Sequence, residues 1–125
     1  MNDISKKKEE FLLKIMSSTN ADKFKRYLGS PLRYAGGKTL AVGYIVKLLP
    51  NKIDRVVSPF LGGASVEIAL AKELGLEVIG YDIFDLLINY WKNQINNPEQ
   101  LYQNLRILAN TKNKYQEVKN ILKNI

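Results

Sequence analysis

The sequence predicts an α/β fold in which short parallel strands are flanked by helices, with further helical segments at both ends of the chain. The first observation is a short apolar run at 56–57, which leads into the glycine-rich turn 58–65 and then into a helical pattern. The second is an apolar run at 77–81 that ends directly before Asp82. The first half of a Rossmann-like nucleotide site has this order of elements: strand, glycine turn, helix, strand and acid. Asp82 follows Gly62 by about 20 residues, the spacing that lets an acid reach ribose hydroxyls.

Apolar periodicity predicts the elements of the N-terminal third. Apolar residues at helical spacing predict an amphipathic helix over 4–16. Asn20 is placed to cap a second helix over 20–28, which the sequence at 29–31 would end. A third helix is expected over 38–49, after a pair of glycines.

The remaining elements alternate between strand and helix before the chain ends in helices. They are a strand over 55–57, a helix over 65–74 with Gly75 as its stop, a strand over 77–81, and helices over 85–95, 101–108 and 115–125. A strand–helix–strand crossover is right-handed in almost all proteins, so the two strands should lie side by side and parallel. The turn at Gly62 and the carboxylate of Asp82 should then open onto one crevice at the carboxyl ends of the strands.

Length and composition limit the possibilities. At 125 residues the chain is a single domain, 1–125, or part of one. It has neither Cys nor His, which disfavours a disulfide framework, a metal site or a histidine base. The polar N-terminus and the lack of an apolar stretch of about 20 residues predict a cytoplasmic protein.

The net charge of +7 has two interpretations. Lysine and arginine are concentrated in the first third of the chain, where they could form an ordinary solvated face of a helix. They could also form a surface that attracts the phosphates of a nucleic acid. Charge alone does not choose between the two.

The glycine turn can be compared with known nucleotide motifs. A dinucleotide fingerprint that starts at Gly62 requires glycine at positions occupied here by Ala64 and Glu67, so NAD fits poorly. The sequence at 37–39 is similar to the end of a phosphate-binding P-loop, but position 32 is leucine instead of the required glycine. Of the ligands that such motifs bind, a nucleoside without a pyrophosphate therefore remains as the one that this turn could hold.

Three motifs in a fixed order carry a resemblance to a known family. Residues 33–38 (Arg-Tyr-Ala-Gly-Gly-Lys), residues 59–65 (Pro-Phe-Leu-Gly-Gly-Ala-Ser) and the pair 82–83 (Asp-Ile) resemble the Dam-type adenine-specific DNA methyltransferases over about 30–97. That resemblance implies a partial Rossmann-like methyltransferase fold with S-adenosyl-L-methionine as cofactor. It implies these cofactor-binding residues: Tyr34, Gly36, Gly37, Lys38, Ser58, Pro59, Phe60, Gly62, Asp82 and Ile83.

The resemblance also implies roles for these residues. Tyr34 and Lys38 would contact the cofactor, the turn with Phe60 and Gly62 would hold its methionine end, and Asp82 would bind its ribose. Structural alternatives stay open: the tyrosine as a core aromatic, the lysine as a solvated residue at a helix start, and the aspartate as a helix cap. The sequence departs from the family pattern at two positions, Ser58 and Ala64.

Many members of the family carry an acid suited to the methionine ammonium where this chain has Ser58. Ala64 stands where the turn has its second glycine. A hydroxyl still forms hydrogen bonds, and alanine is the smallest alternative to glycine. The affinity for the cofactor depends on both positions.

The family's Asp-Pro-Pro-Tyr motif, which holds the flipped adenine, has no counterpart in this chain, because no two prolines are adjacent. We therefore expect no catalytic residue here.

The expected function is that of the cofactor-binding N-terminal part of a DNA adenine N6-methyltransferase, as in restriction-modification, without the target-recognition part. Its expected partners are double-stranded DNA and a second polypeptide carrying the missing motif. The apolar stripe of the last helix would suit such a partner; it consists of Tyr115, Val118, Ile121, Leu122 and Ile125. The alternatives are a catalytically inactive basic DNA-binding or regulatory remnant and a non-functional remnant that self-associates.

Overall fold

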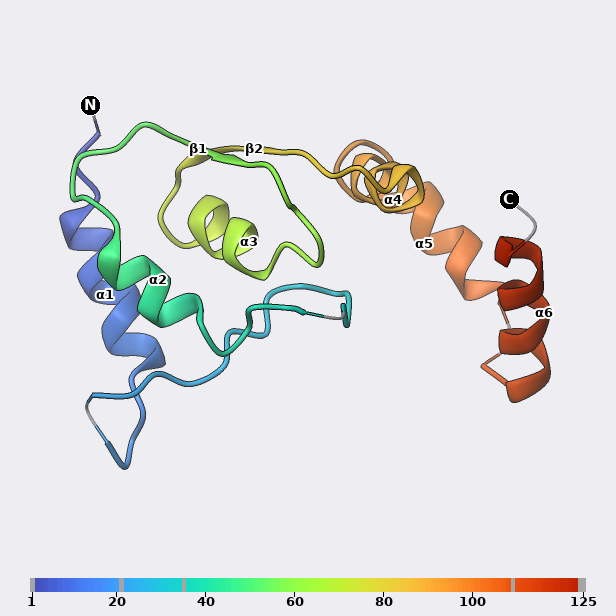
Figure 1. The fold of residues 1–125 in the computed structure, drawn as a ribbon, viewed down its shortest axis with the longest axis horizontal. Helices are drawn as coiled ribbons and strands as arrows, with labels where there is room; N and C mark the ends of the chain where they lie inside the picture. Colours follow the sequence, from blue (N-terminus) through green and yellow to red (C-terminus); the bar gives the residue numbers. More distant parts are fainter. Residues whose placement is uncertain (1, 21, 35, 109, 124–125) are drawn as a thin grey trace. The chain divides into compact units, whose positions relative to one another are not determined.

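The computed structural model describes residues 2–20, 22–34, 36–108 and 110–123 (Figure 1). The chain forms two compact units, Met1–Phe84 and Asp85–Ile125. The expectation of one partial domain over 1–125 stays a prediction. Within the described residues, no helix combines the length and the apolar character needed to cross a membrane.

A two-stranded parallel sheet organises the first unit. β1 (Arg55–Ser58) pairs with β2 (Glu77–Gly80), with Arg55 opposite Glu77 and Ser58 opposite Gly80. The helix α3 (Ser65–Lys72) connects the two strands. The predicted α/β class with short parallel strands is therefore confirmed. Because parallel strands end at the same edge, the residues that follow β1 and those that follow β2 lie next to each other.

Three helices form the core of this unit with the sheet. α1 (Ser5–Ile15) packs against α2 (Val42–Leu48), which contacts α3, and α3 packs on β2 (Figure 1). The core consists of apolar side chains that are less than a tenth exposed: Ile4, Phe11, Ile15, Val42, Val46, Ala69, Leu70, Leu74 and Leu76. Eight of these residues lie in ranges predicted as helices, and Leu76 directly precedes β2. This core packs against the sheet and leaves the carboxyl ends of the two strands uncovered.

The predicted helix over 20–28 is wrong. Met16 and Phe24 instead form an isolated antiparallel bridge, and the amide of Lys25 donates to the carbonyl of Ile15 at 2.7 Å. The Asn20 side chain accepts a hydrogen bond from the amide two residues later, at 2.9 Å. Asparagine thus closes a local turn instead of capping a helix, a competition that short polar side chains often win.

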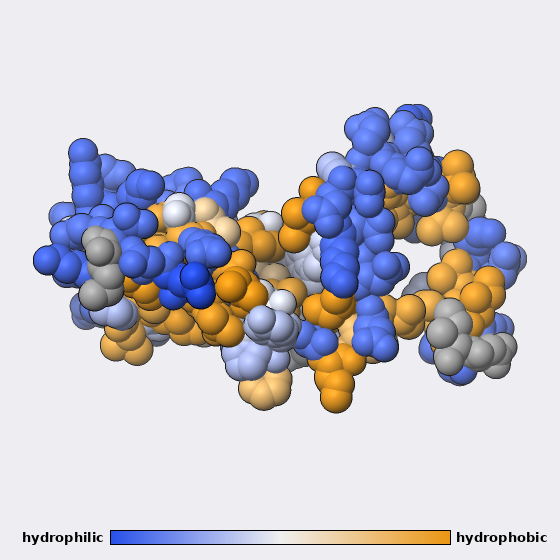
Figure 2. All heavy atoms as spheres, turned by 90° about the horizontal axis from the view of Figure 1, so that it is seen from above, coloured by the Kyte–Doolittle hydropathy of each residue, from blue (hydrophilic) through white to orange (hydrophobic). Residues whose placement is uncertain are grey.

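The second unit is helical. It contains α4 (Asp85–Asn96), α5 (Pro98–Arg106) and α6 (Lys112–Lys123). Leu87 and Trp91 of α4 are buried, whereas α5 and α6 bury no residue. On α6 the predicted stripe is exposed at its large residues, which are Tyr115, Ile121 and Leu122, and Ile125 lies outside the described residues. Figure 2 shows apolar residues at the surface in both units.

Gly75 ends α3 as predicted. Its φ of 67° is left-handed, and the amide of Leu76 donates to the carbonyl of Leu70 at 3.1 Å across it. A hydrogen bond across a left-handed glycine that follows a helix satisfies one of the last carbonyls of that helix.

Gly75→Ala should therefore lower the free energy of unfolding by about 1–2 kcal/mol, because a side chain disfavours this φ. An added Cβ would lie 2.9 Å from Lys7 Nζ, the mobile end of a long side chain that can move away. Gly75→Asn should lose less stability, since asparagine tolerates the left-handed region. Urea unfolding of the three proteins measures the difference. Equal losses for both variants would show that the contact with Lys7, and not φ, sets the effect.

Candidate functional site

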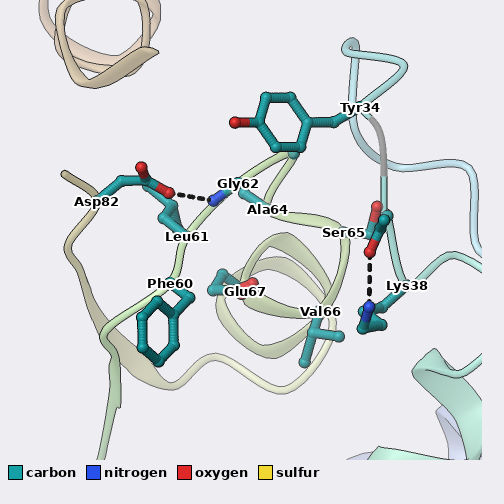
Figure 3. A pocket seen from close by; sticks show the side chains of 13 residues that line it. Tyr34, Lys38, Phe60, Leu61, Gly62, Ala64, Ser65, Val66, Glu67 and Asp82 are labelled. Atoms are coloured by element: carbon teal, nitrogen blue, oxygen red, sulfur yellow. Dashed lines mark hydrogen bonds between the residues drawn. The ribbon is translucent and has the colours of Figure 1, made fainter. Parts of the chain in front are cut away.

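A pocket of about 260 Å³ opens at the carboxyl edge of the two strands (Figure 3). It is formed by the glycine pair after residue 35, the turn after β1, the first turn of α3 and Asp82. Seven of the ten predicted cofactor residues line it: Tyr34, Gly36, Gly37, Lys38, Phe60, Gly62 and Asp82. The other three, Ser58, Pro59 and Ile83, do not.

Backbone hydrogen bonds extend the pairing of the strands into the turn. The amide of Tyr81 donates to the carbonyl of Ser58 at 2.7 Å, and the amide of Leu61 donates to the carbonyl of Tyr81 at 2.8 Å. These bonds hold the residues after β1 beside the residues after β2. The turn favours glycine at Gly62, whose φ of 52° is left-handed.

Asp82 connects the two sides of the pocket. Its Oδ2 accepts a hydrogen bond from the Gly62 amide at 3.0 Å, and its Oδ1 accepts one from the Phe84 amide at 3.0 Å. The Phe84 amide, and after it the Gly62 amide, lower the pKa of this carboxyl below its ordinary value. Asp82 thus carries a negative charge at neutral pH. Both bonds go to turn amides outside any helix, so the helix-cap interpretation does not describe it.

Tyr34 lies against the glycine turn (Figure 3). A Cβ added to Gly62 would come within 3.4 Å of the Tyr34 ring, and one added to Gly63 within 2.9 Å of the Tyr34 Cβ. Ser30 Oγ also donates to the Gly63 carbonyl. Since Tyr34 is 40% exposed, it is no core aromatic. The segment before the glycine pair is therefore fixed to the turn that follows β1.

Lys38 lies in a turn and not at the start of a helix, so the expected helix over 38–49 begins too early. The amide of Ala41 donates to the Lys38 carbonyl at 2.9 Å, and α2 begins only at Val42. The ammonium donates to the carbonyl of Gly36 at 2.6 Å beside the pocket. Because the lysine is four residues ahead of the helix, the interpretation as a solvated residue at a helix start does not describe it. Ala35 of the same motif lies outside the described residues.

Ala64 shows why this turn favours glycine. Its φ of 57° and ψ of 28° are left-handed, a conformation that is unfavourable for a residue with a Cβ by about 1 kcal/mol or more. Its methyl group is buried, and its carbonyl accepts the amide of Ile68 at 2.9 Å at the start of α3. The turn thus keeps its shape with alanine at this position.

Glu67 is a pocket residue that the sequence did not single out. In the sequence it counts only as a mismatch to the dinucleotide pattern, yet its side chain lines the pocket from the first turn of α3. Ser58 Oγ donates to Glu67 Oε2 at 3.4 Å. Burial raises the pKa of the Glu67 carboxyl, and the Glu67 amide and the Ser58 hydroxyl oppose that rise only in part. No signal in the sequence would have identified it, because only the folded chain brings this carboxylate next to Ser58.

Three predicted residues stay outside the lining. Ser58 contributes through its contact with Glu67, and Pro59 is exposed. Ile83 is 98% exposed, so nothing in the described chain covers it.

A second hollow, of about 700 Å³, adjoins the first. Both are lined by Tyr34 and by the glycine pair that follows it. Arg26 and Arg33 line the second hollow only, and Arg26 Nη1 donates to Thr39 Oγ1 at 3.0 Å. Positive side chains therefore lie next to the pocket that holds Asp82.

Comparison with known proteins identifies relatives over short stretches. The chain is 38% identical over 61 residues to "Modification methylase StsI" of Streptococcus sanguinis, a match to 49% of this chain and 9% of that protein. It is 50% identical over 42 residues to "Type II methyltransferase M.FokI" of Planomicrobium okeanokoites, which covers 34% of this chain and 6% of that protein. It is 31% identical over 71 residues to "Type II methyltransferase M1.LlaDCHI" of Lactococcus lactis subsp. cremoris, which covers 57% of this chain and 24% of that protein. The matched stretches thus span less than a quarter of each relative. No solved structure shows a significant match.

A family model matches residues 34–124, a stretch that begins at Tyr34 and contains the glycine turn, Asp82 and most of the second unit. That match covers well over half of the chain, and it agrees with the methyltransferase resemblance of the three motifs. The chain belongs to the D12 class of N6 adenine-specific DNA methyltransferases.

Proposed function

We propose that this chain binds S-adenosylmethionine and forms the cofactor-binding part of an enzyme that methylates N6 of adenine in DNA. The observation that carries the proposal is the convergence of three separate motifs on one pocket at the end of two parallel strands. These motifs are the segment with Tyr34 and Lys38, the turn with Gly62, and Asp82. Ligands bind in crevices of this kind in open α/β sheets.

The pocket residues fit the chemistry of the cofactor. The ionised Asp82 carboxylate keeps acceptor capacity for ribose hydroxyls, because its oxygens offer about four lone pairs in total. Phe60 is 87% exposed and Tyr34 is 40% exposed, so each has an apolar surface that a bound nucleoside would cover. When bound, S-adenosylmethionine supplies a methyl group activated by its sulfonium charge. The residues of this chain would bind and orient it.

We further propose that transfer needs a second polypeptide or a further part of the same protein. The 125 residues contain no Asp-Pro-Pro-Tyr, and the sheet of the described residues has two strands. An open sheet of two parallel strands covered on one side is rarely stable alone. The exposed apolar residues of α6 suit a contact with such a partner. We place the protein in the cytoplasm, where DNA is accessible.

Asp82→Ala should weaken binding of S-adenosylmethionine at least about tenfold, because charge-assisted hydrogen bonds to the ribose are lost. Isothermal titration calorimetry measures the affinity, and circular dichroism verifies that the variant is folded. Asp85→Ala is the matched control, since this carboxylate is exposed and does not line the pocket. An unchanged affinity combined with lower stability would mean that Asp82 only shapes the turn.

The purified 125-residue chain should transfer no labelled methyl group to DNA by itself. Positioning and electrostatic stabilisation supply most of the rate of such a reaction, and half of a site provides little of either. Addition of a polypeptide that carries Asp-Pro-Pro-Tyr should produce transfer that Asp82→Ala abolishes. Transfer by the chain alone would show that its catalytic groups lie elsewhere. Persistent inactivity with intact DNA binding would favour the inactive DNA-binding remnant.

Duplex DNA is the proposed macromolecular partner, and the net charge of +7 with the two arginines of the second hollow supports it. Affinity for a duplex should fall steeply between about 50 and 200 mM salt and depend little on sequence, because phosphate contacts dominate. Arg33→Ala should reduce the slope of log affinity against log salt by about 1. Lys112→Ala, in the second unit, is the control and should reduce the slope less. Binding that is insensitive to salt would contradict phosphate contact.

A further inference from the structure

Glu67 is a carboxylate in the pocket without a cationic partner among the described residues. Among the described residues, the carboxylates that form ion pairs with a lysine or an arginine are those of Glu73, Glu77 and Glu117. Asp82, the other acid of the pocket, is held by two backbone amides. Glu67 has only the Ser58 hydroxyl at 3.4 Å and its own amide.

The surroundings of Glu67 are unfavourable for its charge in the unliganded protein. Burial is the largest influence on its pKa and raises it. An acid in the first turn of a helix is favoured by the helix dipole, which explains why glutamate is tolerated at this place. The dipole does not explain why the carboxylate lines a pocket and accepts a hydrogen bond from the end of β1. A half-buried carboxylate that lies in a cleft and has no cationic partner is typical of a site where a ligand supplies the opposite charge.

From this geometry we infer that Glu67 binds the α-ammonium group of the methionine part of S-adenosylmethionine. The inference rests on the proposed function. It assigns the two acids of the pocket to two chemically different ends of one ligand: Asp82, after β2, to the ribose hydroxyls, and Glu67, in α3, to the ammonium (Figure 3). The ammonium has N–H donors that form charged hydrogen bonds, whereas the sulfonium has none, so the carboxylate suits the ammonium better.

The test compares two ligands that differ in one group. S-adenosylhomocysteine carries the ammonium and no sulfonium. Its analogue with a hydroxyl in place of the amino group carries neither an ammonium nor a sulfonium. The unaltered chain should bind S-adenosylhomocysteine at least about tenfold more tightly than the hydroxyl analogue, as measured by calorimetry. In Glu67→Gln this preference should disappear, whereas affinity for the hydroxyl analogue stays the same. Glu77→Gln, an exposed glutamate of β2, is the matched control and should keep the preference.

A third ligand separates this inference from the proposed function. 5′-Methylthioadenosine has the adenosine part and lacks the amino-acid part, so Glu67→Gln should bind it like the unaltered chain. If neither 5′-methylthioadenosine nor S-adenosylhomocysteine binds the unaltered chain, the proposed function fails, and the inference fails with it. If both bind and Glu67→Gln keeps the preference for the amine, only the inference fails. Weaker binding of S-adenosylmethionine with unchanged binding of S-adenosylhomocysteine would assign Glu67 to the sulfonium instead.

Glu67→Asp covers the case in which the amide variant does not fold. It keeps the charge and shortens the side chain, so it should retain part of the preference for the amine. An undiminished preference in a folded Glu67→Asp, with 5′-methylthioadenosine still bound, would argue against a direct contact between carboxylate and ammonium, because the shorter side chain should weaken such a contact.

Discussion

The hydrogen bond between the Asp82 carboxylate and the Gly62 amide is the contact on which the candidate site depends. It joins residues 20 positions apart and closes the pocket between the ends of the two strands. The bond requires the parallel register that places Ser58 opposite Gly80. A shift by one residue would turn the side chains of a strand to the other face and separate the partners. The buried faces of the helices hold that register from behind, so the packing of the core determines the shape of the site.

Much of this arrangement could be predicted from the sequence, because it follows from local patterns. Apolar periodicity gave α1, α3 and α4, and the glycine turn between two apolar runs indicated the parallel pair. The three motifs indicated the family. These features depend on neighbours within a few residues or on one well-known crossover rule.

What could not be predicted depends on contacts between distant segments. The stretch after α1 is extended because its amides pair with residues elsewhere: Lys25 with Ile15, and Tyr27 with the carbonyl of Thr39 at 2.9 Å. No local pattern shows such pairing, and Asn20, which was expected to cap a helix, closes a local turn instead. Glu67 was missed for a similar reason, since its importance comes from the hydroxyl of Ser58, which only the folded chain brings close.

The two acids of the pocket show how surroundings set the properties of identical groups. Backbone amides lower the pKa of Asp82, whereas burial raises that of Glu67. One carboxylate is already stabilised by the protein, and the other still lacks an opposite charge. Groups whose surroundings move their pKa values apart often have different tasks in one site.

The position of Trp91 determines what fluorescence spectroscopy can report. It is the single tryptophan of the chain, and it is buried in α4 of the second unit, whereas every residue that lines the pocket belongs to the first unit. Selective excitation of tryptophan therefore follows the helical unit and leaves the folding of the unit with the pocket unobserved. A tryptophan introduced at the exposed Phe60 would give the first unit a signal of its own and make the two parts of the chain distinguishable in one titration.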